Sequence, residues 1–299
     1  MPEIKVVAVV VTYNRLDLLK ENINALLAQK YNDFDIMIID NASTDGTEKY
    51  VRSIENKKIN YINTGSNLGG AGGFSFGVRK AIEKGYDFAW LMDDDTIPAY
   101  DALDSFIKKT DKFNGEFSYL ASVVRWKDGQ LCEMNKQYLS QEWENEIDMM
   151  RNKLIPVNSS SFVSFYVDLN IAKKVGLPQK DFFIYGDDWE YSLRLSSVKP
   201  GYLDLDSEVV HKMKNNVSID IVNECEDRLE RYFYNYRNVY YIHRKYLSRK
   251  KLMLYKLKYY YTIIQILSSK SNKKLKRISI MKKGMKKGKK YNPVIEYVQ

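Results

Sequence analysis

Short apolar runs alternate with amphipathic segments along the first third of the chain. Between the runs, apolar residues recur every three or four positions, which predicts helices at Leu16–Leu27, at Thr47–Ile54 and from a glycine-rich segment to about Lys84. Strands that alternate with helices favour an α/β fold around a mostly parallel sheet with right-handed crossovers. The mostly apolar runs, typical of strands covered on both faces, are Ile4–Val11, Phe34–Ile39, Ile59–Asn63 and Phe88–Met92.

The pattern changes after about Lys112. From Cys225 onward the chain is predicted to be helical, and its Lys-rich last part to be low in complexity and partly disordered. Between these points the predicted elements are strands at Tyr119–Trp126 and Ser160–Val167, a helix at Tyr191–Ser196, and short extended pieces at Gly201–Leu205 and Glu208–His211.

Charge is distributed unevenly along the 299 residues. The net charge is +9, yet the segment from Arg244 to Lys290 holds 18 of the 47 Lys and Arg residues and none of the 38 Asp and Glu residues. The rest of the chain therefore carries 29 basic and 38 acidic residues, a net charge of −9. A basic tail on an acidic body predicts attraction to a polyanionic surface, whereas nucleic-acid binding would rest on the tail alone and is not expected.

The composition excludes several classes of protein. Hydrophobic residues make up 44% of the chain, enough to bury a core and too many for a wholly disordered protein. The two cysteines, Cys132 and Cys225, are too few for a disulfide scaffold, lack metal-ligand spacing and suit a reducing compartment. The N-terminus shows no signal-peptide pattern, and no apolar run approaches the ~18 residues of a membrane-spanning helix.

The strongest chemical signal is a triplet of carboxylates, Asp93-Asp94-Asp95, directly after a predicted buried strand. Open α/β sheets bind ligands at the carboxyl ends of their strands. Three adjacent carboxylates repel one another unless a cation neutralises them, and oxygen ligands suit Mg²⁺ or Mn²⁺ shared with substrate phosphates. A solvated acidic turn is the alternative, but the apolar strand that leads into the triplet favours a metal site.

Two further features follow predicted strands. Asp40 ends the second strand, where a carboxylate can accept hydrogen bonds from a nucleoside, with an Asx turn or helix cap as the alternative. The segment Gly69–Gly73 holds four glycines in five residues, which either lets the backbone approach a ligand closely or makes a flexible loop. It matches neither the dinucleotide fingerprint nor the Walker pattern, which argues against NAD and ATP sites.

Acidic residues also open a later helix, in the run Asp187-Asp188-Trp189-Glu190. Such residues suit the helix dipole, which is a purely structural explanation. An Asp beside a divalent metal and a bound sugar can instead act as a general base that deprotonates an attacking hydroxyl. His211, one of two histidines, is either structural or a further metal ligand, since imidazole suits borderline divalent ions.

Five motifs in this order and strand context resemble the inverting nucleotide-sugar glycosyltransferases of family 2. The similarity covers roughly Val6 to His211 and continues more weakly through Tyr246. The run Asn-Leu-Gly-Gly-Ala-Gly-Gly-Phe followed by Met-Asp-Asp-Asp is similar, more narrowly, to bacterial galactofuranosyltransferases, which use UDP-galactofuranose. The five motifs are Val11–Arg15, Asp40–Thr47, Asn67–Phe74, Trp90–Asp95 and Gly186–Arg194.

The resemblance implies a GT-A fold, and the composition adds a basic helical C-terminal extension. Residues 1–222 would form the catalytic domain, with 1–112 binding the nucleotide sugar and 113–222 the acceptor, and 223–299 the helical region. It also implies that Asp93, Asp95 and His211 bind the divalent metal, Mn²⁺ or Mg²⁺, on the donor diphosphate, and that Asp188 is the catalytic base of a single displacement with inversion. The donor contacts that it implies are Thr12, Asp40, Asn67, Gly69, Gly70 and Asp94.

The chain departs from the family in ways that leave alternatives open. Mycobacterial-type galactofuranosyltransferases carry an N-terminal β-rich domain, whereas this chain starts at the first strand of the fold. They also have a Trp just before the Asp pair, where this chain has Gly186. Acceptor specificity and polymerising activity therefore stay open. The segment Arg231–Asn238 is similar to one in family 2 rhamnosyltransferases, which makes dTDP-rhamnose an alternative donor. A nucleotidyltransferase would usually show a basic glycine-rich loop near its N-terminus, and a non-catalytic polyanion- or membrane-binding protein would explain the tail but not the strand-end acids.

The segment Arg249–Leu267 alternates basic residues with Leu, Tyr and Ile. Lys-rich amphipathic helices lie on anionic membranes. Because acceptors in such pathways are often polyprenyl-linked glycans, the resemblance implies a cytoplasmic enzyme, peripheral on the inner face of a bacterial membrane, that builds a surface polysaccharide such as capsule or O-antigen. The oligomeric state stays open, a homo-oligomer included. The residues expected to cover one side of a helix are Leu252, Leu254, Tyr255, Leu257, Tyr259, Tyr260, Ile263, Ile264 and Leu267.

Overall fold

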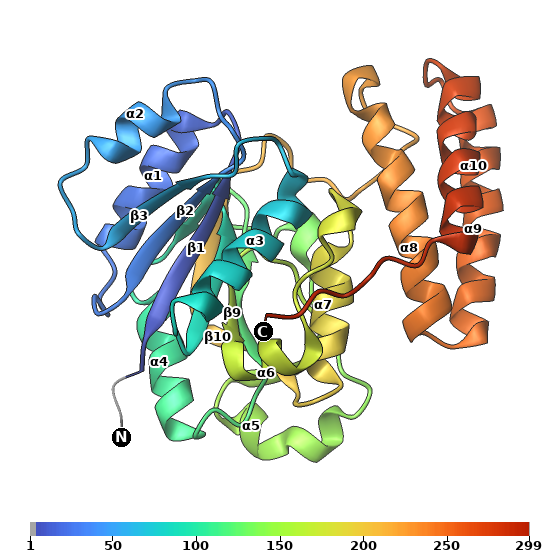
Figure 1. The fold of residues 1–299 in the computed structure, drawn as a ribbon. Helices are drawn as coiled ribbons and strands as arrows, with labels where there is room; N and C mark the ends of the chain where they lie inside the picture. Colours follow the sequence, from blue (N-terminus) through green and yellow to red (C-terminus); the bar gives the residue numbers. More distant parts are fainter. Residues whose placement is uncertain (1–3, 299) are drawn as a thin grey trace.

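One ten-stranded sheet organises the computed structural model, which describes residues 4–298 (Figure 1). Its strands lie in the order β3-β2-β1-β4-β9-β6-β10-β8-β7, and β5 pairs with β10. The strands are β1 (Val6–Thr12), β2 (Asp35–Asp40), β3 (Ile59–Asn63), β4 (Phe88–Asp93), β5 (Thr96–Pro98), β6 (Tyr119–Arg125), β7 (Tyr138–Leu139), β8 (Leu154–Ser159), β9 (Phe165–Asp168) and β10 (Gly201–His211).

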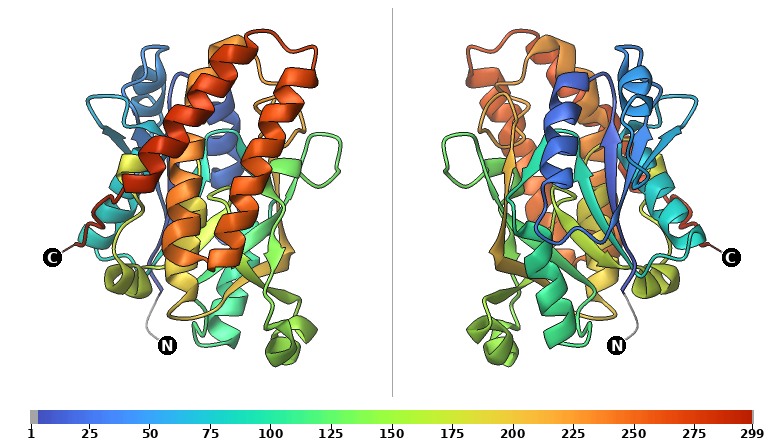
Figure 2. Two further views of the ribbon diagram at one scale, coloured as in Figure 1. Left: turned by 90° about the vertical axis from the view of Figure 1, so that its right-hand side faces the viewer. Right: turned by 90° about the vertical axis from the view of Figure 1, so that its left-hand side faces the viewer.

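Helices cover both faces of this sheet and form a separate group at its side (Figures 1 and 2). α1, α2 and α4 contribute to the core on one face, and α3, α6 and α7 to the core on the other. α8, α9 and α10 pack on one another around a third cluster. The helices are α1 (Leu16–Leu27), α2 (Thr47–Arg52), α3 (Gly69–Glu83), α4 (Ala102–Lys112), α5 (Ile147–Arg151), α6 (Leu169–Val175), α7 (Asp187–Ser196), α8 (Tyr232–Tyr246), α9 (Arg249–Ser268) and α10 (Lys274–Lys290).

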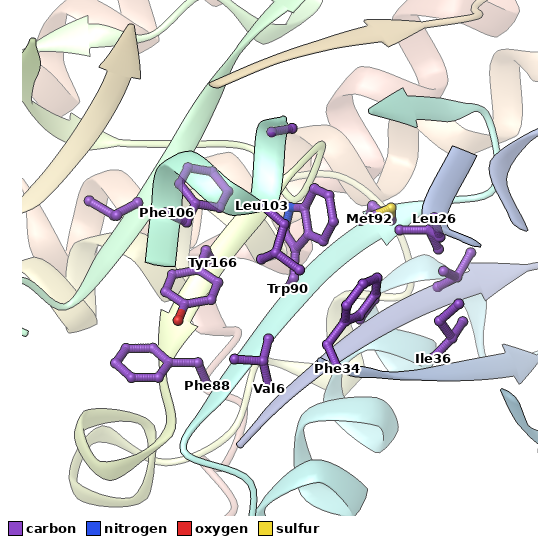
Figure 3. Packing of buried hydrophobic residues seen from close by; sticks show 14 of the residues in the cluster. Val6, Leu26, Phe34, Ile36, Phe88, Trp90, Met92, Leu103, Phe106 and Tyr166 are labelled. Atoms are coloured by element: carbon purple, nitrogen blue, oxygen red, sulfur yellow. The ribbon is translucent and has the colours of Figure 1, made fainter. Parts of the chain in front are cut away.

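The apolar sequence of β1 follows from its position between two cores. Alternate residues from Val6 to Val11 enter the cores on opposite faces, because successive side chains of a strand point to opposite sides. On one face, Trp90 of β4 packs edge-on against Phe106 of α4, with ring centroids 6.2 Å apart, and its indole N–H donates to Ser164 (Figure 3). β1 and β4 pair directly in parallel, so their carboxyl ends lie next to each other.

The prediction of an α/β fold is confirmed. β3, β2, β1 and β4 pair in parallel, whereas β9 runs antiparallel to both β4 and β6, so the sheet is mixed in its second half. The single strand predicted at Ser160–Val167 is wrong, because β8 ends at Ser159 and β9 begins only at Phe165. The two extended pieces predicted before His211 are one strand, β10, whose register shifts between Asp204 and Glu208.

The glycine-rich segment is not a loop, because α3 begins inside it at Gly69. A Cβ atom at Gly73 would lie 2.6 Å from Cγ1 of Val11, and one at Gly77 would lie 2.4 Å from Cγ1 of Val9. Real carbon atoms do not approach so closely, so these two glycines let α3 lie directly on β1. Gly70 differs from them, since nothing lies within 4 Å of its Cβ position.

The Lys-rich end of the chain forms a helix, α10, and the prediction of partial disorder there is wrong. A Cβ atom at Gly284 would lie 2.7 Å from the carbonyl oxygen of Phe233, so glycine lets α10 approach α8 closely. After α10 the chain runs back across the sheet domain (Figure 1). There the backbone N–H of Leu177 donates to the carbonyl of Glu296 at 2.7 Å, and the Glu296 carboxylate pairs with Arg79 at 2.9 Å.

The apolar residues of α9 divide between two sides of the helix, so the prediction that they cover one side is wrong. Leu252, Tyr255, Tyr259 and Ile263 pack into the cluster shared with α8 and α10, whereas Leu254, Leu257, Tyr260, Ile264 and Leu267 are exposed. Among residues 4–298, none of the helices combines the length and the hydropathy that a membrane span requires.

Candidate active site

The carboxyl ends of β2, β1 and β4 meet at one edge of the sheet. In the register of these strands, Thr12 pairs with Asp40, and Val11 pairs with Asp93. Parallel pairing therefore places Thr12, Asp40 and the acidic triplet at the same edge, where open α/β sheets bind their ligands.

Protein cations and donors face the carboxylates of the triplet. Oγ1 of Thr12 donates to Asp94 at 2.8 Å, and Nη1 of Arg15 donates to Asp95 at 2.5 Å and to Asp94 at 3.3 Å. Asp94 and Asp95 are buried and Asp93 is half-buried. Because Arg15 directly precedes α1, the turn after β1 brings its guanidinium over the end of β4.

His211 reaches this edge from the far part of the sheet. It pairs with Thr96 in β5, which follows the triplet directly. Its Nε2 lies 3.1 Å from Oδ1 of Asp95, an ion-pair distance, although that buried oxygen forms no hydrogen bond. Its Nδ1 lies 2.8 Å from Oδ1 of Asn135. Since an amide oxygen only accepts, Nδ1 carries a proton and Nε2 faces the carboxylates.

Burial and mutual repulsion shift the protonation of this edge. Burial and the neighbouring Asp95 raise the pKa of Asp93 to about 7, and burial raises the pKa of Asp94 to about 6. Burial also disfavours the ionised form of Asp95, but His211 and Arg15 lower the pKa of this carboxyl to about 2. Burial lowers the pKa of His211, yet contacts with Asp95 and Cys132 outweigh that effect and raise it to about 10. The edge therefore favours added positive charge.

The side chains at this edge are of the kinds that bind a hard divalent cation, although they do not lie in a coordination geometry. Asp93, Asp95 and His211 offer two carboxylates and an imidazole, and Oδ1 of Asp95 has no hydrogen-bond partner. Within residues 4–298, however, no group of three or more His, Cys, Asp or Glu side chains is placed to hold an ion. Arg15 and His211 both lie on Asp95, so a cation would have to displace at least the Arg15 contact.

Asp40 lies fully buried beside this edge, and the protein uses both of its carboxylate oxygens. Oδ1 accepts from the backbone N–H of Ser43 at 2.8 Å, and Oδ2 accepts from the hydroxyl of Tyr61 at 2.6 Å. The first contact is the turn that the sequence offered as the structural alternative. In this arrangement, a nucleoside would share the carboxylate with Ser43 and Tyr61.

The start of α3 lies against the end of β2. Nδ2 of Asn41 donates to the carbonyl of Gly69 at 3.0 Å, and Oδ1 of Asn67 accepts from the backbone N–H of Gly69 at 2.9 Å. The open space at Gly70 lies on this first turn. The positive end of a helix dipole therefore points to the sheet edge, an arrangement that stabilises an anionic group.

Asp187 and Asp188 occupy the first turn of α7. Burial, the adjacent Asp188 and the nearby Asp93 all raise the pKa of Asp187 well above its usual value. The backbone N–H of Ala71 in α3 donates to the carbonyl of Phe183 at 3.2 Å, so the segment that leads into α7 lies against the start of α3. Burial raises the pKa of Asp188 to about 6. Glu190 on the same helix is committed to structure, because it pairs with Arg194 at 2.8 Å and accepts from the hydroxyl of Tyr246.

Three residues at this site received no role from the sequence. Arg15 neutralises the triplet, Asn135 sets the proton on His211, and Asn238 of α8 donates to the carbonyl of Tyr185 just before α7, at 2.8 Å. The position of Arg15, three residues after a strand end that faces acids, was an available signal. Nothing marked Asn135, which lies in a polar stretch whose fold depends on distant partners.

Comparison with known proteins gives several relatives. Residues 7–171 match the model of Glycosyl transferase family 2. The chain is 27% identical over 196 residues to galactofuranosyltransferase GlfT1 of Mycolicibacterium smegmatis and 28% identical over 198 residues to that of Mycobacterium tuberculosis, over 64% of this chain in both cases. These matches span 65% and 64% of the two relatives. Poly-beta-1,6-N-acetyl-D-glucosamine synthase of Staphylococcus aureus is 32% identical over 91 residues, 30% of this chain and 21% of the synthase.

Two solved structures are similar in fold, each at 13% identity. Residues 1–349 of Staphylococcus aureus TarS superpose with a TM-score of 0.56, over 94% of this chain and 71% of that chain. GalNAc-T7 with UDP, GalNAc and Mn²⁺ superposes with a TM-score of 0.63, over 95% of this chain and 56% of that chain. These similarities, with the mixed sheet flanked by helices, identify the GT-A fold. Because the family model matches more than half of the residues, the chain belongs to glycosyl transferase family 2.

Proposed function

We propose that this protein transfers galactofuranose from UDP-galactofuranose to a glycan acceptor, with inversion at the anomeric carbon. The observation that carries the proposal is that the acidic triplet, His211 and the segment leading into α7 lie around one edge of a family 2 sheet. An acidic edge can bind an anionic nucleotide-sugar donor only if a cation lies between them. The carboxylate and imidazole ligands at this edge suit such a cation. The identity to GlfT1 proteins supports the choice of donor.

Different residues at the sheet edge would bind different parts of the nucleotide-sugar donor. In the proposal, Thr12 and Asp40 contact the uridine, and Asn67, Gly69, Gly70 and Asp94 line the rest of the nucleotide sugar. Asp93, Asp95 and His211 would hold Mn²⁺ or Mg²⁺, which when bound would supply positive charge against the negative charge of the UDP leaving group. GalNAc-T7, a protein of similar fold, was solved with UDP, GalNAc and Mn²⁺, which supports this assignment.

Asp188 is the base of the proposed reaction. The acceptor hydroxyl attacks the anomeric carbon and passes its proton to Asp188, while the bond from that carbon to the diphosphate breaks and UDP leaves with the electron pair. One displacement inverts the configuration. A pKa of about 6 leaves Asp188 mostly ionised at neutral pH and still basic enough to take a proton in the transition state.

We further propose that transfer takes place at the inner face of a bacterial membrane, on a polyprenyl-linked glycan of a surface polysaccharide, with α9 as the attachment surface. Figure 2 shows α9 and α10 on the outer side of α8. Seven large apolar side chains on the outer side of α9 are 52% to 63% exposed. They are Met253, Leu254, Leu257, Tyr260, Tyr261, Ile264 and Leu267.

The charges around α9 favour lipid over a second copy of the chain. Two copies that met through this side would bring together two segments of 18 basic residues without one acidic residue. Anionic headgroups instead attract such residues, by about 1 kcal/mol for each Lys or Arg near the surface. Apolar side chains flanked by Lys and Arg suit shallow burial at the level of the headgroups.

A donor screen tests the proposed reaction. Purified protein is mixed with UDP-galactofuranose, UDP-galactopyranose, UDP-N-acetylglucosamine or dTDP-rhamnose, each with Mn²⁺ and with a chelator, and the melting temperature and donor turnover with a galactan acceptor are measured. We expect UDP-galactofuranose alone to raise the melting temperature and to be turned over, and the chelator to abolish both. Turnover of dTDP-rhamnose instead would make this nucleotide sugar the donor, and a protein that binds and turns over none of the four would refute the proposed choice of donor.

A further inference from the structure

The segment that leads into α7 has an unusual backbone. It follows a short 3-10 helix, Lys180–Phe182, and Phe183, Tyr185 and Gly186 all have positive φ, at 65°, 68° and 84°. The N–H of Ile184 donates to the carbonyl of Phe182 at 2.7 Å, so Phe183 is the centre of a γ-turn with φ 65° and ψ −55°. Such a conformation is strained for a non-glycine residue, so neighbouring contacts must hold it.

Asn238 of α8 supplies those contacts. It is fully buried, and its Nδ2 lies 3.1, 3.1 and 2.8 Å from the carbonyl oxygens of Phe182, Ile184 and Tyr185. Nε of Arg237 donates to Oδ1 of Asn238 at 2.8 Å. Because a guanidinium only donates, this contact fixes the amide with its N–H groups toward the turn.

α3 holds the other side of the turn. The backbone N–H of Ala71 donates to the carbonyl of Phe183 at 3.2 Å, and a Cβ atom at Gly69 would lie 2.1 Å from that same oxygen. α8 also packs on Gly186, where a Cβ atom would lie 3.2 Å from Cδ1 of Ile242. The turn is therefore clamped between the helix that faces the donor edge and the C-terminal helices, and the next residues along the chain are Asp187 and Asp188.

We infer that Asn238 is a positioning residue for Asp188, because it holds the γ-turn in the conformation that presents this carboxylate to the acceptor hydroxyl. The inference rests on the proposed function, in which Asp188 is the base. A displacement of about 1 Å at a reacting group costs about 100-fold in rate. Loss of the amide therefore lowers kcat, while donor binding, which uses other elements, is retained.

The test compares Asn238→Ala and the milder Asn238→Ser with Arg277→Met. Arg277 is a matched control because it is also buried among the C-terminal helices and donates to three carbonyls, those of Ile221, Glu224 and Asn272, none of them in the turn. We expect Asn238→Ala to lower kcat about 10- to 100-fold with the donor KM within about twofold, and Asn238→Ser to lower it less. Amide hydrogen exchange of residues 183–188 should speed up in both. Arg277→Met should lower the melting temperature and change neither kcat nor exchange in the turn.

Three results would overturn the inference. They are an unchanged kcat in a folded Asn238 variant, a parallel loss of kcat and donor affinity, and an equal loss of kcat in Arg277→Met at an equal loss of melting temperature. If Asn238→Ala does not fold, Asn238→Ser decides by the same measures. Failure of the unmodified protein to transfer any sugar would refute the proposed function instead, and hydrogen exchange at residues 183–188 would still decide whether Asn238 holds the turn.

Discussion

Alanine at two glycines of α3, Gly70 and Gly77, separates the packing role of this helix from its proposed donor role. At Gly77 the new Cβ would lie 2.4 Å from Cγ1 of Val9 and 3.3 Å from Cγ1 of Ile39. Both are buried residues of the core between α3 and the sheet. At Gly70 nothing lies within 4 Å of the new atom, and the backbone is not left-handed. The same chemical change therefore meets a filled core in one case and open space in the other.

The expected effects have opposite signs. Overpacking a core costs about 1–3 kcal/mol, and the 2.4 Å approach to Val9 puts Gly77→Ala in the upper part of that range, at about 2–3 kcal/mol. After a gain in helix propensity of about 1 kcal/mol, the variant should lower the free energy of unfolding by about 1–2 kcal/mol. Gly70→Ala should raise it by about 0.4–1 kcal/mol, because alanine restricts the unfolded chain at a position that the residue can adopt. Urea unfolding of both variants, followed by tryptophan fluorescence, measures the difference.

Donor affinity should change in the reverse pattern. If the open space at Gly70 receives the donor, the added methyl collides with it at a cost of about 1–3 kcal/mol, which is about a 5- to 150-fold loss of affinity. Folded Gly77→Ala should bind the donor as the unmodified protein does. A Gly77→Ala variant as stable as the unmodified protein would refute the packing argument, and a Gly70→Ala variant with full donor affinity would remove Gly70 from the donor site.

Three further substitutions test the site and the attachment surface. Asp188→Asn should lower kcat by about 10²–10⁴-fold and leave donor binding intact, and equal losses of affinity and turnover would make Asp188 a binding residue. The rate of the unmodified enzyme should rise with pH through about 6, because only the ionised base accepts a proton. Without metal, the free energy of unfolding should fall as pH rises from 6.5 toward about 10, because folded His211 keeps a proton that the unfolded chain has released. Urea unfolding at several pH values measures this slope. A His211→Asn variant with the same slope would contradict the raised pKa of His211. The double variant Leu257→Asp and Ile264→Asp should sediment with anionic vesicles at least about tenfold less, whereas Leu205→Asp, at an exposed position of β10, should sediment as the unmodified protein does. Unchanged sedimentation of the double variant would exclude the outer side of α9 as the attachment surface.

The sequence predicted the acidic edge because local rules and the fold agree there. A strand that is apolar throughout must be covered on both faces, parallel strands must end at the same edge, and the register that pairs Val11 with Asp93 is the one those rules produce. The contact between His211 and Asp95 was expected only from family resemblance. It depends on β10 reaching β5 over a sequence separation that no periodicity reports.

The errors lie where tertiary contacts override local propensity. Four glycines in five residues left a flexible loop open as an alternative, yet close packing on β1 makes glycine the residue that the helix requires at Gly73. The Lys-rich end reads as disordered, yet Met281, Gly284 and Gly288 recur at helical spacing on one side and meet α8. In both segments the composition was informative about the unfolded chain, whereas the structure depends on the surface against which each helix packs.

The two cations at the acidic edge, Arg15 and His211, differ in how freely they can leave it, and this difference bears on the metal site that we propose there. Buried carboxylates without counter-charges would destabilise the fold by several kcal/mol, so some cation must stay with Asp94 and Asp95 at all times. The Arg15 side chain is 44% exposed and can turn into solvent at little cost, whereas that of His211 is 7% exposed and held by Asn135. In the proposed reaction, Arg15 would therefore be the counter-ion that an incoming divalent cation replaces, whereas His211 would stay and bind the ion once Nε2 has released the proton that the raised pKa holds there.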